Sequence, residues 1–131
     1  MFLLLNINMS RLKVLSKHLR DVYQGKAPAG AIRSTKWPKV RKAHLEKHPT
    51  CAVCNSTIQL EVHHIVPFAR DPEKELDPDN LITLCENSND GVICHLLFGH
   101  LGNYQCLNPN VVEDAKIWND KFNKRERSKN K

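Results

Sequence analysis

The sequence predicts a small α+β domain that is held together by a metal site. Its 131 residues support one compact domain with a modest core, which needs further stabilisation. Four of the five cysteines and four of the seven histidines lie between residues 51 and 100. Short apolar segments in the same stretch have the patterns of two strands and one helix. Together these observations favour a β-β-α unit built around metal ligands.

Charge is distributed unevenly along the chain, although the formal net charge is +6. Residues 1–50 carry 11 Lys/Arg against two Asp/Glu, and residues 111–131 carry seven against four. Residues 51–110 instead carry two against eight. Basic flanks around an acidic centre favour binding of a polyanion by the flanks, although solvated helix faces would give the same composition.

The N-terminal apolar run, residues 1–5, lacks a basic n-region and is shorter than the apolar part of a signal peptide. No run reaches the roughly 18 apolar residues that a membrane span requires. We therefore expect a cytoplasmic protein that has no membrane partner. In a reducing compartment, closely spaced cysteines more often hold zinc than form disulfides.

Two helices are predicted before the central segment. In the first, apolar residues recur at helical spacing from Ser10 to Tyr23, and a Gly/Pro-rich stretch then ends the pattern. The second is expected between Arg33 and His48, with Trp37, Val40 and Leu45 facing the core. Its remaining faces are basic and suited to DNA phosphates. The candidate DNA-binding residues are Lys36, Lys39, Arg41 and Lys42.

Four cysteines are candidates for a structural zinc site. Cys51 and Cys54 have the two-residue spacer of a zinc knuckle, although this motif alone is also compatible with redox chemistry. Cys85 and Cys94 can supply the second pair, with a loop between them. Four thiolates would close a tetrahedral site that stabilises the fold. Cys106 is then unpaired, and we expect it to be a small apolar filler.

The segment between the cysteine pairs predicts two strands joined by a loop. Residues 58–65 alternate between apolar and polar, and residues 81–84 form a second strand in a hairpin-like pair. On a regular strand His63 and His64 point to opposite faces, so one can reach a metal while the other faces a substrate. Asn80 ends the loop, and we expect its side chain to bond nearby backbone and to hold His64 in orientation.

A short helix is expected from about residue 90 to Gly99, with His95 facing the strand pair close to His63. His100 is five residues beyond His95, a spacing that is awkward for sharing one face of an α-helix unless the helix ends first.

A closing amphipathic helix is expected over residues 111–122, followed by a frayed, charged tail over residues 123–131. The inward residues predicted for this helix are Val111, Ala115, Trp118 and Phe122.

Four motifs follow one another in the sequence: CxxC, EVHHIVP, DNLITLC and CH. This ordered combination resembles the HNH endonucleases, and it looks closest to short stand-alone phage and prophage members. The resemblance covers about residues 33–119 and implies a small ββα-metal finger with a four-cysteine structural zinc site, flanked by helices. It implies an N-terminal helix and linker over residues 1–32, a nuclease domain over residues 33–119 and a basic tail over residues 120–131.

The resemblance also implies roles for individual residues. His64 corresponds to the general base and Asn80 to the residue that fixes the loop. His63 and His95 correspond to ligands of a catalytic divalent metal. The ligands implied for structural zinc are Cys51, Cys54, Cys85 and Cys94.

Two features depart from the family pattern. The spacer between Cys85 and Cys94 is long, and the usual second helical ligand position falls on Gly99. His100 is therefore considered as a further ligand of the catalytic metal, beside phosphate contact and simple packing as alternatives.

These residues predict hydrolysis of DNA phosphodiester bonds, by nicking or double-strand cleavage, because a histidine can deprotonate water near neutral pH. An imidazole-rich site favours Mn²⁺, Ni²⁺, Co²⁺ or Zn²⁺, and Mg²⁺ fits where phosphate and water supply the other ligands. The alternative is a non-catalytic, zinc-stapled module that binds DNA or joins a phage terminase or packaging complex. We expect a bacterial, phage- or prophage-encoded protein, and the sequence sets no oligomeric state.

Overall fold

The computed structural model describes residues 17, 19–20, 23–24, 32–87 and 92–131. The first predicted helix lies outside the described residues, apart from residues 17, 19–20 and 23, which are helical. The elements that follow are α2 (Trp37–Lys47), β1 (Leu60–His64), the 3-10 turns η1 (Pro72–Lys74) and η2 (Pro78–Asn80), β2 (Leu81–Cys85), the π-helical η3 (His95–Gly99) and α3 (Val111–Lys129).

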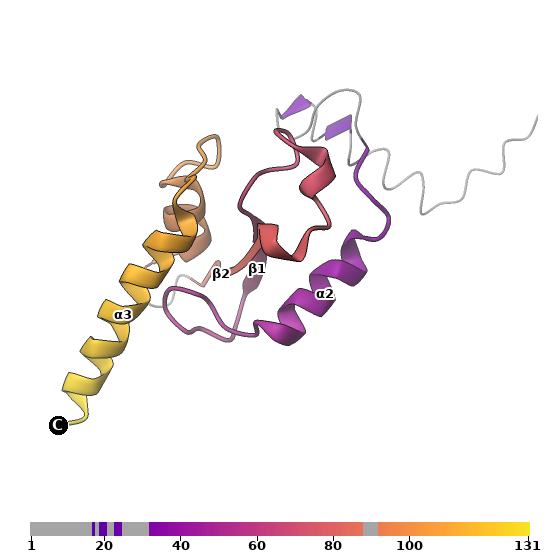
Figure 1. Ribbon diagram of the computed structural model, residues 1–131. Helices are drawn as coiled ribbons and strands as arrows, with labels where there is room; N and C mark the ends of the chain where they lie inside the picture. The colour runs from indigo at the N-terminus through magenta and orange to yellow at the C-terminus, as the bar shows by residue number, and fades with distance from the viewer. Residues whose placement is uncertain (1–16, 18, 21–22, 25–31, 88–91) are drawn as a thin grey trace, which may run out of the picture.

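The two strands form an antiparallel sheet in which Leu60 pairs with Cys85 and His64 with Leu81. Figure 1 shows the sheet between α2 on one side and η3 with α3 on the other. The Ile65 amide donates to the Asn80 carbonyl at 2.8 Å, which closes the loop directly beyond the sheet. The predicted α+β class and the strand pair are therefore confirmed.

The core is small and rich in thiols. Three of its seven buried members are cysteines, so the cysteine cluster is itself the centre of packing. The seven are Cys51, Val53, Leu84, Cys85, Cys94, Val111 and Ala115. A core of this size buries little apolar surface. The stability of the fold therefore depends on the interactions that hold the cysteine thiols together.

Helix α2 begins with Pro38 in its first turn, where a missing amide costs nothing. Its buried residue is His44, which is 8% exposed, whereas Trp37, Val40 and Leu45 are half-buried. The expectation that these apolar residues form the core face holds only in part, because Trp37 instead packs against a histidine at the loop end of the sheet.

Helix α3 is longer than the sequence pattern predicts. It continues to Lys129, so the expectation of a frayed tail after Phe122 is wrong. Val111 and Ala115 are buried as expected, but Trp118 is 50% exposed.

Polar contacts hold the second half of α3. Asn119 donates to the Val53 carbonyl at 2.9 Å, Asn55 donates to Asn123 at 2.8 Å, and Lys129 pairs with Glu126 at 3.1 Å. The spacing of apolar residues contains no information on such polar contacts. A prediction based on that spacing therefore ends the helix too early.

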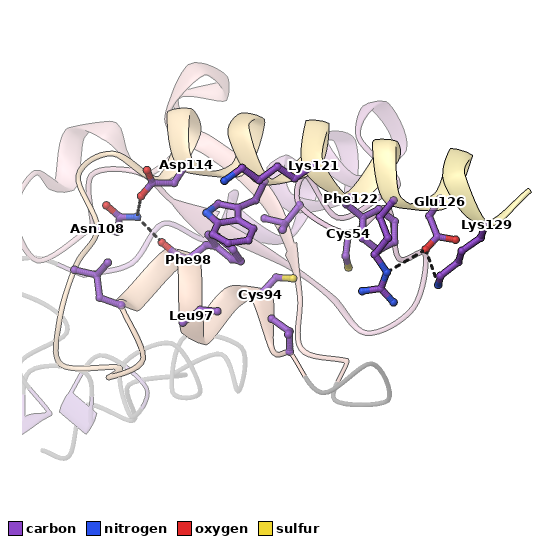
Figure 2. Close-up of a pocket in the computed structure, with 15 residues that line it drawn as sticks. Cys54, Cys94, Leu97, Phe98, Asn108, Asp114, Lys121, Phe122, Glu126 and Lys129 are labelled. Carbon is purple, nitrogen blue, oxygen red and sulfur yellow. Dashed lines mark hydrogen bonds and ion pairs between the residues drawn. The ribbon is translucent and has the colours of Figure 1, made fainter. Parts of the chain in front are cut away.

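A cavity of about 820 Å³ lies between α3 and η3, where Leu97, Phe98, Trp118 and Phe122 line it (Figure 2). Asn108 bridges its two walls by donating to the Phe98 carbonyl at 2.9 Å and to an Asp114 oxygen at 2.8 Å. None of the described histidines lines this cavity. In the part of the chain that the structure describes, no helix has the length and apolar character of a membrane span.

Candidate metal and catalytic centre

The four predicted cysteines meet in one cluster. Their Sγ atoms all lie within 4.8 Å of one another, and those of Cys54 and Cys85 are 3.6 Å apart. Four sulfurs at about 2.3 Å from a central zinc ion would be separated by roughly 3.8 Å. The cluster therefore has the dimensions of a tetrahedral metal site without being cross-linked by disulfides.

The cysteines come from three parts of the local fold. Cys51 and Cys54 lie in a tight turn in which the Asn55 amide donates to the Cys51 carbonyl at 3.0 Å. Asn55 has a φ of 62°, a left-handed conformation that Asn tolerates better than most residues. Cys85 is the last residue of β2 and Cys94 immediately precedes η3.

Burial and mutual proximity perturb these thiols strongly. Burial is the main cause that raises the pKa of Cys54, to about 12. The pKa of Cys51 is lowered to about 5, chiefly because the Cys94 thiol donates a hydrogen bond to it, and the pKa of Cys94 is raised by the same contact. Four crowded thiols can ionise together only beside a cation, so the donor set fits a metal such as zinc.

Three histidines form a second cluster. His63, His95 and His100 each offer a ring nitrogen within 4.8 Å of the others. The ring centroids are 5.2 Å apart for His63 and His95 and 4.9 Å apart for His63 and His100. The Nε2 atoms of His95 and His100 are only 3.3 Å apart.

The π-helical turn of η3 explains how His100 reaches this cluster. In an α-helix, residues five apart are rotated by about 140° around the axis. A π-helix repeats from i to i+5, which returns His100 to the face of His95. The five-residue spacing therefore does not prevent His95 and His100 from facing the same cluster. The helix also starts later than predicted, since residues 92–93 are not helical.

Gly99 is required by the close approach of the histidine rings. A Cβ atom at this position would lie 3.0 Å from Cε1 of His63 and 3.3 Å from Cδ2 of His95. No side chain fits there without displacing the His63 ring. The position at which the family resemblance places a second helical ligand is thus closed to a side chain, and the neighbouring His100 faces the cluster.

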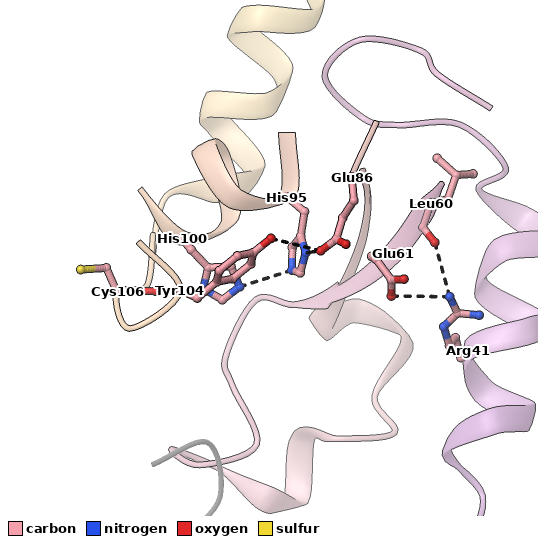
Figure 3. A network of polar contacts seen from close by, with 8 residues as sticks. All are labelled: Arg41, Leu60, Glu61, Glu86, His95, His100, Tyr104 and Cys106. Atoms are coloured by element: carbon pink, nitrogen blue, oxygen red, sulfur yellow. Dashed lines mark hydrogen bonds and ion pairs between the residues drawn. The ribbon is translucent and has the colours of Figure 1, made fainter. Parts of the chain in front are cut away.

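The two helical histidines are oriented by acceptors on their outer sides (Figure 3). His95 Nδ1 lies 2.8 Å from a Glu86 carboxylate oxygen, and His100 Nδ1 lies 2.9 Å from the Cys106 carbonyl. Both acceptors require the hydrogen on Nδ1, which leaves a lone pair on each Nε2. Two lone pairs that face each other repel, and a cation between them removes the repulsion.

His63 completes the set as a neutral ring. It is 5% exposed, and its buried Nε2 has no hydrogen-bond partner among the described residues. Burial, followed by the proximity of His95 and His100, lowers the pKa of His63 to about 3. An unsatisfied buried nitrogen is costly, and a metal ion would supply its missing partner. The three histidines therefore fit a divalent metal.

His64 lies apart from this cluster and has a different environment. Its Nε2 donates to the Glu75 carbonyl at 2.9 Å, so the lone pair is on Nδ1. The ring packs on Trp37 with a centroid separation of 4.5 Å. Burial is the main cause that lowers the pKa of His64, and the Arg33 charge acts in the same direction. His64 is therefore a neutral histidine with an available base nitrogen near pH 7.

Asn80 fixes the loop around His64. The buried amide accepts from the Val66 amide at 2.7 Å and donates to the carbonyls of Val66 at 2.9 Å and Lys74 at 3.1 Å. Lys74 precedes Glu75, whose carbonyl accepts the His64 hydrogen bond. Asn80 thus supports the acceptor that sets the tautomer of His64.

Comparison with family models gives a match over this part of the chain. Residues 51–92 match the model described as HNH endonuclease. This stretch is therefore similar to an HNH endonuclease domain. The matched range includes His63, His64 and Asn80, and it ends before His95 and His100. No curated protein and no solved structure matches the chain.

The four central histidines, His63, His64, His95 and His100, line a single cavity of about 450 Å³. Three further residues that the sequence did not single out as site residues also line it: Arg33, Glu86 and Tyr104. Glu86 directly follows Cys85, a predicted metal ligand, and this position in the sequence could have indicated that its carboxylate lies near the site. Tyr104 lies in a loop without periodicity, and nothing in its local sequence indicates its place.

The predicted DNA-binding residues of α2 do not line this cavity. Lys36, Lys39 and Lys42 are exposed, whereas Arg41 is half-buried. Arg41 forms an ion pair with Glu61 at 3.5 Å, so part of its charge is directed toward β1. The expectation for Cys106 is wrong, since it is exposed rather than a packed filler.

Proposed function

We propose that this chain is a metal-dependent endonuclease that hydrolyses DNA phosphodiester bonds, as nicks or as double-strand breaks. One observation carries the proposal. A single cavity in an HNH-matching chain holds three converging histidines and a fourth, His64, that is kept neutral with its Nδ1 available. These are the two chemical functions that phosphodiester hydrolysis needs, a cation site and a general base.

We further propose that the nuclease domain extends over residues 33–119, with residues 1–32 and 120–131 outside it. Support comes from α2, whose Trp37 packs on His64, and from η3, which carries His95 beyond the matched range. Residues 120–129 continue α3, so the proposed basic C-terminal segment is helical over this range.

His64 acts as the general base in this proposal. Its Nδ1 accepts a proton from the water that attacks the phosphorus atom. The lowered pKa keeps the ring in its base form near neutral pH, because burial disfavours the charged state. Once protonated, the ring is stabilised by the Glu75 carbonyl at Nε2, and Trp37 holds its plane.

His63, His95 and His100 would hold the catalytic divalent metal ion. When bound, such an ion stabilises charge on the phosphate and on the departing 3′ oxygen. Three imidazoles favour Zn²⁺, Mn²⁺, Co²⁺ or Ni²⁺, while Mg²⁺ would depend on oxygen ligands from phosphate and water. The structural ion proposed for Cys51, Cys54, Cys85 and Cys94 is Zn²⁺, because four thiolates form a closed tetrahedral set.

We propose that the exposed lysines of α2, with Arg41 at their edge, contact the DNA backbone. The support is positional, since Trp37 at the start of this helix packs on His64. A duplex with one phosphate beside His64 would therefore run close to Lys36 and Lys39. Such contacts add affinity without sequence preference.

A plasmid-cleavage assay with EDTA and metal add-back tests the function. We expect nicked or linear product, loss of product with EDTA, and recovery with Mn²⁺, Co²⁺, Ni²⁺ or Zn²⁺. Saturated DNA binding without cleavage under every metal would contradict the proposal. It would favour instead a non-catalytic module, such as a subunit of a phage terminase or packaging complex.

A further inference from the structure

A polar network beside the histidine cluster contains two residues to which the proposed mechanism gives no role (Figure 3). One Glu86 carboxylate oxygen lies 2.8 Å from His95 Nδ1 and accepts from the Tyr104 hydroxyl at 3.3 Å. The Tyr104 ring lies 5.8 Å from the His95 ring and 5.2 Å from the His100 ring. Tyr104 thus covers the outer edges of both helical histidines.

We propose that Glu86 is a positioning residue of the histidine metal site, which sets the orientation of His95 and its strength as a ligand. The inference rests on the proposed metal site. A carboxylate that accepts from the far nitrogen of a ligating imidazole fixes the tautomer and makes the near nitrogen more electron-rich. Glu86 touches the ring on the side away from His100, so it acts through His95 and not as a ligand itself.

The surroundings of the cavity make Glu86 distinctive. Among the described residues that line the 450 Å³ cavity, it is the single acidic side chain. Nδ1 of the other helical ring, His100, faces the neutral Cys106 carbonyl instead. A charged acceptor forms the stronger hydrogen bond. Of the two rings, His95 is therefore the stronger electron-pair donor to the metal ion, and His100 is the weaker one.

The fold holds both ends of this contact firmly. Glu86 follows Cys85 at the end of β2, and its backbone amide donates to the Gln59 carbonyl at 2.8 Å. His95 in turn follows Cys94. Because side chains alternate along a strand, Cys85 points into the core while Glu86 points toward the cavity. The cysteine cluster therefore fixes the distance between Glu86 and His95.

Titration with Co²⁺ tests the proposal on protein that carries zinc in its cysteine cluster. The visible absorption of bound Co²⁺ reports both the affinity and the ligand geometry of the histidine site. We expect Glu86→Ala to weaken Co²⁺ binding by about 10- to 100-fold, the usual effect of losing such a partner. Glu86→Gln keeps an acceptor oxygen without its charge, so we expect a smaller loss and a spectrum closer to that of the wild type.

Glu61→Ala is the matched control, because its carboxylate is similarly exposed, 45% against 41% for Glu86, but pairs with Arg41. We expect this control to bind Co²⁺ as the wild type does. Binding by Glu86→Ala within twofold of the wild type would overturn the proposal, and so would equal losses in both alanine variants. A wild-type protein that binds no Co²⁺ through histidines would instead refute the metal site of the proposed function.

Discussion

His95 and His100 face each other with their Nε2 atoms 3.3 Å apart, although an α-helix would place them on different faces. The π-helical turn between them makes this approach possible. Gly99 lies within that turn, at the point where the His63 ring packs against the helix. The geometry of the cluster therefore depends on a helix distortion and on a missing side chain together.

Gly99→Ala is expected to weaken metal binding at the histidine cluster by at least about tenfold. The added methyl would meet the His63 ring at 3.0 Å, and overpacking of this kind costs about 1–3 kcal/mol. Isothermal titration with Co²⁺ measures the effect. Gly102→Ala is the control, since it introduces strain at a φ of +83° with no neighbour within 4 Å. Equal affinities in the wild type and Gly99→Ala would argue against the packing role.

His64→Ala should reduce cleavage by about 10²- to 10⁴-fold, the usual contribution of a general base. Metal content and melting temperature should stay close to those of the wild type, because His64 is not a member of either cluster. Single-turnover nicking kinetics provide the measurement. The exposed His48 supplies a matched histidine control. Nicking by His64→Ala at more than a tenth of the wild-type rate would remove His64 from the role of base.

In a plot of cleavage rate against pH, the loss of activity on the acid side should have its midpoint below pH 6.5. Burial lowers the pKa of His64 from 6.5, so the base form persists to lower pH and activity is lost only as pH falls through the lowered value. A pH–rate profile at saturating metal tests this. In Trp37→Ala the ring is more hydrated, and the midpoint should move up toward 6.5. A wild-type midpoint above pH 6.5 would contradict the assignment.

Cys54→Ser is expected to lose zinc and most of the folded structure. Structural zinc contributes about 10–16 kcal/mol in small zinc-binding peptides, as much as the entire net stability of many domains. Zinc content by atomic emission and thermal melting by circular dichroism give the readouts. Cys106→Ser should change neither, since Cys106 is exposed. A Cys54→Ser protein with the wild-type melting curve would show that the cluster does not stabilise the fold.

Replacing Lys39 and Lys42 by alanine should lower the slope of log affinity against log salt by about two. Each phosphate contact contributes roughly 0.9 to that slope on duplex DNA. Fluorescence anisotropy at several salt concentrations measures it, with catalytic metal omitted to prevent cleavage. Lys116→Ala with Lys124→Ala, two lysines of α3, is the charge-matched control. If the α2 and α3 double variants change the slope equally, the lysines of α2 do not form a specific DNA-binding surface.

The sequence was sufficient to predict the strand pair and to name the members of both clusters. The CxxC spacing of Cys51 and Cys54 is a local signal that the fold confirms. The alternation along residues 58–65 holds only for residues 60–64, because Gln59 has a φ of 51° and Ile58 is 51% exposed. The order of these motifs then led to the HNH family, which the match over residues 51–92 supports.

Other features arise from contacts between distant residues and could not be predicted in this way. The π-helical turn ends at Gly99, which lies against His63, a residue of β1. The contact of Glu86 with Tyr104 joins the end of β2 to a loop that has no pattern of its own. Periodicity reports which face of an element is apolar, but it does not report which polar partner lies on a neighbouring element.

The chain order of the two clusters has a consequence for inhibition. Cys85 is bonded to Glu86 and Cys94 to His95, so a reagent that removes metal from the thiols also loosens the contact that orients His95. Thiol-directed oxidants and soft-metal chelators should therefore inactivate the proposed nuclease by acting at the cysteine cluster, because none of its four residues lines the histidine cavity.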